Sequence, residues 1–153
     1  MAVYFLDSSA IVKRYVEEAG TDWVIGITSP EKDDSIYVAR ITGAEVVSAI
    51  ARRGRGGDIS QDDVTRAMAD FRHDFALAYH VLEITAALIT RAMSLAESHA
   101  LRGYDAVQLA AVLEVNDRCL DLAIPAPTLV SADKALNAAA EAEGLTVDDP
   151  NVH

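Results

Sequence analysis

The sequence predicts an α/β fold, a three-layer sandwich in which helices cover both faces of a central, mostly parallel sheet. Short apolar runs typical of strands alternate along the chain with segments whose apolar residues recur at helical spacing. Residues that cap helices directly follow two of these runs. Hydrophobic residues make up 51% of the 153 residues, which is enough for one core. We therefore expect a single domain over residues 1–149 and a short polar tail at 150–153.

Short runs of strand-forming residues mark the expected sheet. Val3–Leu6 is apolar throughout, which is typical of a strand buried on both faces. Pro125 and Pro127 bracket a turn that leads into the run 128–130. The expected strands are 3–6, 36–39, 81–84, 128–130 and 145–147.

Most of the helices are expected where a capping residue precedes an apolar stripe. A helix should open at Asp7-Ser8-Ser9 and end at Gly20, and a short one around Trp23 should end before Pro30. The segment 53–57 is rich in glycine and should be a flexible break. The remaining helices are expected from Thr42 to about Arg53, from Ser60 to Ala78, from Thr85 to about Ser98, from Tyr104 or Asp105 onward, and after Asp133 as far as Gly144.

The composition excludes several classes of protein. No apolar run approaches the roughly 18–20 residues needed to cross a bilayer. The N-terminus lacks the basic start of a secretory signal. The single cysteine, Cys119, cannot form an internal disulfide or a thiolate metal site, which favours the reducing cytoplasm.

The net charge of −11 argues at first against a nucleic-acid partner, because binding to phosphates needs a basic surface. The charge is uneven, however, since residues 1–57 hold eight acidic and seven basic residues and residues 58–153 hold sixteen and six. Four arginines surround the single acid Glu45: Arg40, Arg52, Arg53 and Arg55. This cationic segment stays available for phosphate groups.

Four acidic residues occupy the places where an open parallel sheet forms its active site. These places are the carboxyl ends of strands and the helix starts that follow them. Asp7 ends the first strand, and Asp133 follows the strand at 128–130. Glu45 and Asp105 each lie in the first turn of an expected helix.

The two helical acids lie on apolar helix faces. Asp105 is spaced i, i+4, i+7 with Leu109 and Val112, and Glu45 shares a stripe with the small Ala49. Inward carboxylates repel one another unless a cation neutralises them, and oxygen ligands select ions such as Mg²⁺ or Mn²⁺. Each acid alone is explained as well by helix capping or by the helix dipole. The set of four favours a metal site suited to phosphodiester hydrolysis.

Several motifs follow one another from about residue 3 to residue 147. They are Tyr4–Tyr15 (YFLDSSAIVKRY), Ala44–Val46 (AEV), Leu101–Ala110 (LRGYDAVQLA) and Val130–Asp133 (VSAD), followed by Leu136, Ala139-Ala140 and Glu143–Leu145. In order and spacing they resemble the PIN-domain ribonucleases, and in particular the VapC toxins of type II toxin–antitoxin pairs. The first and third motifs are fairly specific together, whereas the glutamate motif is weak alone.

The resemblance implies a PIN-like fold and a set of acids that holds Mg²⁺ or Mn²⁺. Asp7 and Asp105 would be the main direct ligands, and Glu45 and Asp133 would complete the cluster directly or through water. The implied activity is that of a metal-dependent endoribonuclease, a toxin that hydrolyses RNA.

Further expectations follow from the same resemblance. Ser9 and Ser131 match hydroxyl positions that support the first and last acids. The implied protein partners are an antitoxin that occupies the acidic cleft and a second copy of the chain in a homodimer. No membrane partner is expected.

Four arginines are candidates for contacts with RNA phosphates: Arg14, Arg52, Arg53 and Arg55. Each has a plain alternative, either as a solvated helix end or as a surface ion pair.

Two other functions stay open. One is a small Mg²⁺-dependent phosphotransfer domain of the receiver or phosphatase type, although Asp7 is followed by serines and not by the second acid of an Asp-x-Asp pattern. The other is a non-catalytic PIN-shaped module that binds RNA. No glycine-rich phosphate loop is present.

Overall fold

A computed structural model describes all residues from 1 to 153, and a five-stranded sheet lies at its centre. The strand order is β3-β2-β1-β4-β5, and every neighbouring pair is parallel. The strands are β1 (Val3–Leu6), β2 (Ser35–Ala39), β3 (His80–Leu82), β4 (Thr128–Val130) and β5 (Thr146–Asp148). The predicted α/β fold with a mostly parallel sheet is confirmed.

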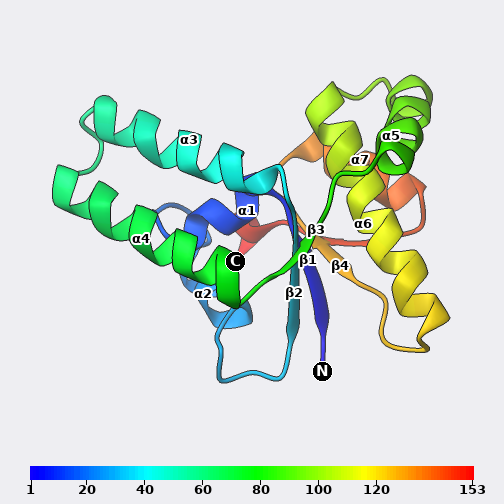
Figure 1. Ribbon diagram of the computed structural model, residues 1–153, viewed down its shortest axis with the longest axis horizontal. Coiled ribbons are helices and arrows are strands. Elements are labelled where there is room, and N and C mark those ends of the chain that lie inside the picture. The colour runs from blue at the N-terminus through cyan, green and yellow to red at the C-terminus, as the bar shows by residue number, and fades with distance from the viewer.

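Helices cover both faces of this sheet (Figure 1). One face carries α1 (Ser8–Ile11), α2 (Thr21–Ile27), α3 (Thr42–Arg55) and α4 (Gln61–Leu77). The other face carries α5 (Ala86–His99), α6 (Gly103–Asp121) and α7 (Lys134–Ala142). None of the helices is long and apolar enough to cross a bilayer.

Each face of the sheet has its own buried cluster. Phe5 and Leu129 belong to the cluster under α5, α6 and α7, whereas Leu6 and Val130 belong to the cluster under α1 to α4. Successive side chains of a strand point to opposite faces. Both faces of β1 and β4 are therefore buried, which explains why their sequences are continuously apolar.

Capping side chains set the starts of three helices as predicted. Ser60 Oγ accepts a hydrogen bond from Asp63 N at 3.1 Å, and Thr85 Oγ1 accepts one from Leu88 N at 3.1 Å. The Asp7 side chain caps α1 in the same way, by accepting from Ala10 N. Each bond satisfies a backbone donor that the first helical turn leaves free.

The first helix is shorter than predicted. α1 ends at Ile11 and passes into a single 3₁₀ turn, η1 (Val12–Arg14), and Gly20 precedes α2 instead of ending α1. The expectation counted Val16 as a helical position. Val16 is buried in the connection between η1 and α2, so tertiary packing accounts for its apolar character.

The C-terminal segment packs against this connection. It forms the 3₁₀ turn η2 (Pro150–Val152), and Lys13 Nζ donates to Asn151 Oδ1 at 2.9 Å. Gly20 has a φ of +85°, and a Cβ there would lie 2.1 Å from the carbonyl oxygen of Pro150. A side chain at position 20 would therefore collide with the C-terminal segment. The expected domain boundary at residue 149 stays a prediction.

The hairpin of α3 and α4 extends away from the sheet as an arm (Figure 1). The two helices approach closely near its tip, where a Cβ on Gly54 would lie 2.5 Å from Val64 Cγ2. The base of this arm lies beside the carboxyl ends of the strands, where the four predicted acids are found.

Candidate active site

Asp7 and Ser131 lie next to one another because they follow paired strands. Leu6 of β1 pairs with Val130 of β4, and Asp7 N donates to Val130 O at 3.2 Å. Since all five strands are parallel, their carboxyl ends meet at one edge of the sheet. The fold therefore brings two segments from opposite ends of the chain to one place.

Asp7 is buried, with 4% of its surface exposed, and its carboxylate is held by hydrogen-bond donors. Oδ1 accepts from Ser9 Oγ at 2.6 Å and from Ala10 N at 3.0 Å. Oδ2 accepts from Ser131 Oγ at 2.8 Å. Burial and, to a smaller extent, the negative charge of Glu45 together raise the pKa of Asp7 to about 6 in spite of these donors.

Glu45 comes to the same edge of the sheet on the first turn of α3. Its Oε2 accepts from Ser8 Oγ at 2.8 Å, and its Oε1 accepts from Gln108 Nε2 at 3.2 Å. Burial raises the pKa of Glu45, and the charge of Asp105 adds to this effect. The two donors act in the opposite direction because they stabilise the carboxylate.

Asp105 and Asp133 lie at the starts of α6 and α7. Burial raises the pKa of Asp105, and the charge of Asp133 raises it further, whereas Arg102 lowers it. Asp133 Oδ1 accepts from Leu136 N at 2.9 Å and so caps α7. The Ser131 hydroxyl accepts from Asp133 N at 3.0 Å and donates to Asp7, so it links the first and last acids.

Each carboxylate feels the negative charge of the next. Glu45 raises the pKa of Asp7, Asp105 raises that of Glu45, and Asp133 raises that of Asp105. No group of three or more His, Cys, Asp or Glu side chains already converges as a ligand set. The donor chemistry nevertheless fits a hard divalent cation, because the set offers carboxylate oxygens and no thiolate or imidazole. A cation would also relieve the mutual repulsion of these carboxylates, of which Asp7 is buried and the other three are partly buried.

A groove of about 550 Å³ opens beside one of these carboxylates, that of Glu45. It lies between the start of α1, one face of α3 and the start of α6. Glu45 lines it together with Ser48, Arg52 and Tyr104. The groove therefore borders the acidic site with one cationic and one aromatic side chain.

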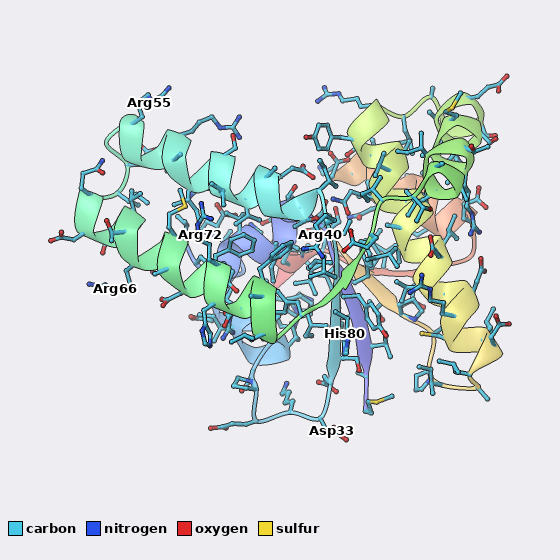
Figure 2. The ribbon with its side chains drawn as sticks, in the orientation of Figure 1. Asp33, Arg40, Arg55, Arg66, Arg72 and His80 are labelled. Atoms are coloured by element: carbon cyan, nitrogen blue, oxygen red, sulfur yellow. The ribbon has the colours of Figure 1, made fainter.

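The structure brings one of the four candidate arginines to this groove, Arg52. Arg14 instead donates to Thr28 Oγ1 at 2.8 Å and pairs with Asp74 at 3.4 Å, and Arg53 pairs with Glu18. Figure 2 shows Arg55 at the far end of the arm, away from the sheet.

Several residues that support this site were not identified from the sequence. Ser8 and Gln108 hold the Glu45 carboxylate, and Thr42 accepts a second hydrogen bond from Gln108 Nε2 at 3.0 Å. One signal for Gln108 was present in the sequence, since it is a polar residue three positions after Asp105 on a helix face that is otherwise apolar.

Comparison with known proteins gives a consistent result. Residues 4–142 match the PIN domain family. Ribonuclease VapC45 of Mycobacterium tuberculosis is 34% identical over 149 residues, covering 96% of this chain and 95% of that relative. The match therefore covers nearly the whole length of both chains.

Two solved structures share the fold. VapC20 of Mycobacterium tuberculosis, described as a sarcin–ricin loop cleaving toxin, has a TM-score of 0.62 at 16% identity, covering 90% of this chain and 95% of that one. VapBC2 of Rickettsia felis, bound to a DNA fragment from their promoter, has a TM-score of 0.62 at 13% identity, covering 96% of this chain and 98% of that one.

Proposed function

This chain belongs to the PIN-domain family, and we propose that it is a metal-dependent endoribonuclease that acts as the toxin of a toxin–antitoxin pair. One observation carries the proposal. The buried Asp7 carboxylate lies at the carboxyl edge of a parallel sheet and interacts with Glu45, which interacts in turn with Asp105. The identity with Ribonuclease VapC45 over nearly the whole chain supports RNA as the substrate.

The cofactor is proposed to be Mg²⁺ or Mn²⁺. Ribonucleases of this family depend in general on a divalent metal. Asp7 and Asp105 would be its main direct ligands, with Glu45 and Asp133 acting directly or through water. When bound, the ion supplies Lewis-acid activation of the attacking water and neutralises charge that develops on the phosphate.

The residues around the acids would keep the ligand oxygens in position. Ser9, Ser131 and the backbone of Ala10 hold both oxygens of Asp7. Ser8 and Gln108 hold both oxygens of Glu45. Side chains fixed in this way lose little conformational entropy when an ion binds, which favours tight and specific coordination.

The proposed partners follow from the same assignment. The partner protein would be an antitoxin that occupies the acidic cleft, and a basic segment would suit a chain with a net charge of −11. We further propose that the toxin forms a homodimer and acts in the cytoplasm.

The test is cleavage of total RNA by the full chain, with sequencing of the new ends. We expect cleavage with Mg²⁺ or Mn²⁺, none with EDTA, and none for Asp105→Asn. Asp121→Asn is a matched control, because Asp121 is an exposed acid at the other end of α6. Full activity of Asp105→Asn, or cleavage that survives EDTA, would contradict the proposal.

A further inference from the structure

The groove beside the acids carries two side chains that the proposed metal site does not use. Tyr104, which directly precedes Asp105, lines the groove and has 52% of its surface exposed. Arg52 lines it as well, and none of the ion pairs in the protein involves Arg52. The groove therefore presents an exposed aromatic ring and an uncompensated cation on walls that also include Glu45.

The helix geometry of α3 separates the acid from the cation. Glu45, Ser48 and Arg52 are spaced i, i+3, i+7, so they lie on one face of the helix. At 1.5 Å per residue, Arg52 lies about 10 Å along the helix from Glu45. Tyr104, at the start of α6, forms a different wall of the groove. A ligand with an anionic group and a flat ring could contact both walls.

We propose that this groove is a subsite for one unpaired RNA nucleotide beside the cleaved bond, with Tyr104 stacking on its base and Arg52 binding its phosphate. The inference rests on the proposed function. Unpaired RNA bases stack on aromatic side chains, and arginine binds phosphate through paired donors. A volume of about 550 Å³ lies within the range of small-ligand sites.

The Arg52 end of the groove, about 10 Å along α3 from Glu45, favours RNA over a basic protein segment as its occupant. Arg52 repels a cationic side chain and attracts a phosphate. Stacking contacts the face of a base, not its edge, so the subsite would select an unpaired nucleotide without selecting a particular base. The basis for choosing a cleavage site would then be single-strandedness at this position.

Binding of RNA can be measured separately from cleavage. The probe is a short single-stranded RNA that carries 2-aminopurine, whose fluorescence is quenched by stacking, with Ca²⁺ in place of Mg²⁺. We expect Tyr104→Ala to remove the quenching and to weaken binding about tenfold, because the stacked base is lost. Tyr104→Phe keeps an aromatic ring and should retain both. Met93→Ala, at an exposed apolar residue of α5, is the matched control.

The contribution of Arg52 is tested by the salt dependence of RNA binding. Arg52→Gln should weaken binding and reduce the slope of log K against log salt by about 0.7, the value for one phosphate contact on a single strand. Arg66→Gln, at an exposed arginine on α4 (Figure 2), should change neither.

The outcomes separate this inference from the proposed function. If the wild-type chain cleaves RNA and Tyr104→Ala binds and quenches like wild type, the subsite is wrong and the nuclease stands. If wild type quenches the probe through Tyr104 but cleaves nothing, the groove still binds an unpaired nucleotide and the nuclease is wrong. Unchanged RNA binding in Tyr104→Ala together with weaker binding of a basic peptide would assign the groove to a protein partner and overturn the inference.

Discussion

Gln108 on α6 donates a hydrogen bond from Nε2 to Glu45 Oε1 on α3 at 3.2 Å. Gln108 is 3% exposed, and its own Oε1 is buried without a hydrogen-bond partner. An unsatisfied buried acceptor costs about 1–3 kcal/mol, so stability alone favours an apolar residue at this position. The arrangement is explained if the amide serves to hold the Glu45 carboxylate.

The other unpartnered buried side-chain atom also lies behind the acids. It is Oδ1 of Asn137, whose Nδ2 donates to the carbonyl oxygen of Ser131 at 2.8 Å. Ser131 in turn binds Asp7. The protein therefore leaves two amide oxygens unsatisfied, and both belong to residues that support the candidate site.

Replacement of Gln108 should separate stability from metal binding. In Gln108→Met the loss of two hydrogen bonds is offset by removal of the unsatisfied oxygen, so the free energy of unfolding in EDTA should change by less than about 1.5 kcal/mol. Affinity for Mn²⁺ should fall about 10–100-fold, as expected when a group that orients a ligand is lost. Calorimetric titration with Mn²⁺ and urea unfolding would measure the two effects.

Gln61→Met is the control for that experiment, because Gln61 is exposed at the start of α4. A Gln108→Met protein that binds Mn²⁺ like wild type would show that the amide has no positioning role.

Removal of the Asp7 charge should stabilise the metal-free protein. Burial raises the pKa of Asp7 from 3.8 to about 6, and each unit corresponds to about 1.4 kcal/mol of preference for the neutral form. Asn fits the site, since its oxygen can keep the bonds from Ser9 and Ala10 while its amide donates to Ser131. We expect Asp7→Asn to raise the free energy of unfolding by about 1–3 kcal/mol at pH 7.5 in EDTA.

The same variant should lose RNA cleavage. If Asp7→Asn is less stable than wild type, the buried charge of Asp7 is not destabilising. If Asp7→Asn still cleaves RNA, Asp7 is not a required metal ligand.

The difference in the free energy of unfolding between Asp7→Asn and wild type should depend on pH. In the folded protein Asp7 holds its proton up to about pH 6, whereas in the unfolded chain it loses it near 3.8. Between these values the folded state binds more protons, so the contribution of Asp7 to stability falls as pH rises. The extra stability of Asp7→Asn over wild type should be near zero below pH 4 and should reach its full value above about pH 6, as urea unfolding in EDTA would show.

Metal binding should show the opposite trend. A cation competes with the proton on Asp7, so Mn²⁺ affinity should weaken as pH falls below about 6. Affinity that is constant from pH 7 to pH 5 would argue against Asp7 as a ligand.

A partly buried ion network supports the N-terminal segment and the arm together. Glu18 pairs with Lys13 Nζ at 2.9 Å and also with Arg53, and Lys13 is 4% exposed. Glu18→Ala leaves a buried ammonium without its carboxylate, so we expect a loss of about 2–4 kcal/mol in thermal or urea unfolding.

Glu83→Ala removes an exposed partner from Arg40, where water and salt screen the charges, so it should reduce stability far less than Glu18→Ala does. Equal effects of the two substitutions would show that burial does not strengthen the Glu18 network.

Local chemistry along the chain determined much of the fold. Unbroken apolar runs predicted the parallel strands, and Ser60, Thr85 and Asp7 predicted helix starts, because capping acts over three or four residues and strand burial acts within one run. The acids could be assembled as candidates for the same reason, since each follows a strand or opens a helix.

The tertiary structure decided which side chains support those acids and which cations are free. Gln108 meets Glu45 across 63 positions of sequence, and Arg53 meets Glu18 across 35, so no local period connects either pair. Helix and strand periodicities report only which face of an element is apolar. The partner of a polar group depends on how those faces pack. For this reason the sequence alone left open whether Arg14 and Arg53 contact RNA or form ion pairs, and packing pairs Arg14 with Asp74 and Arg53 with Glu18.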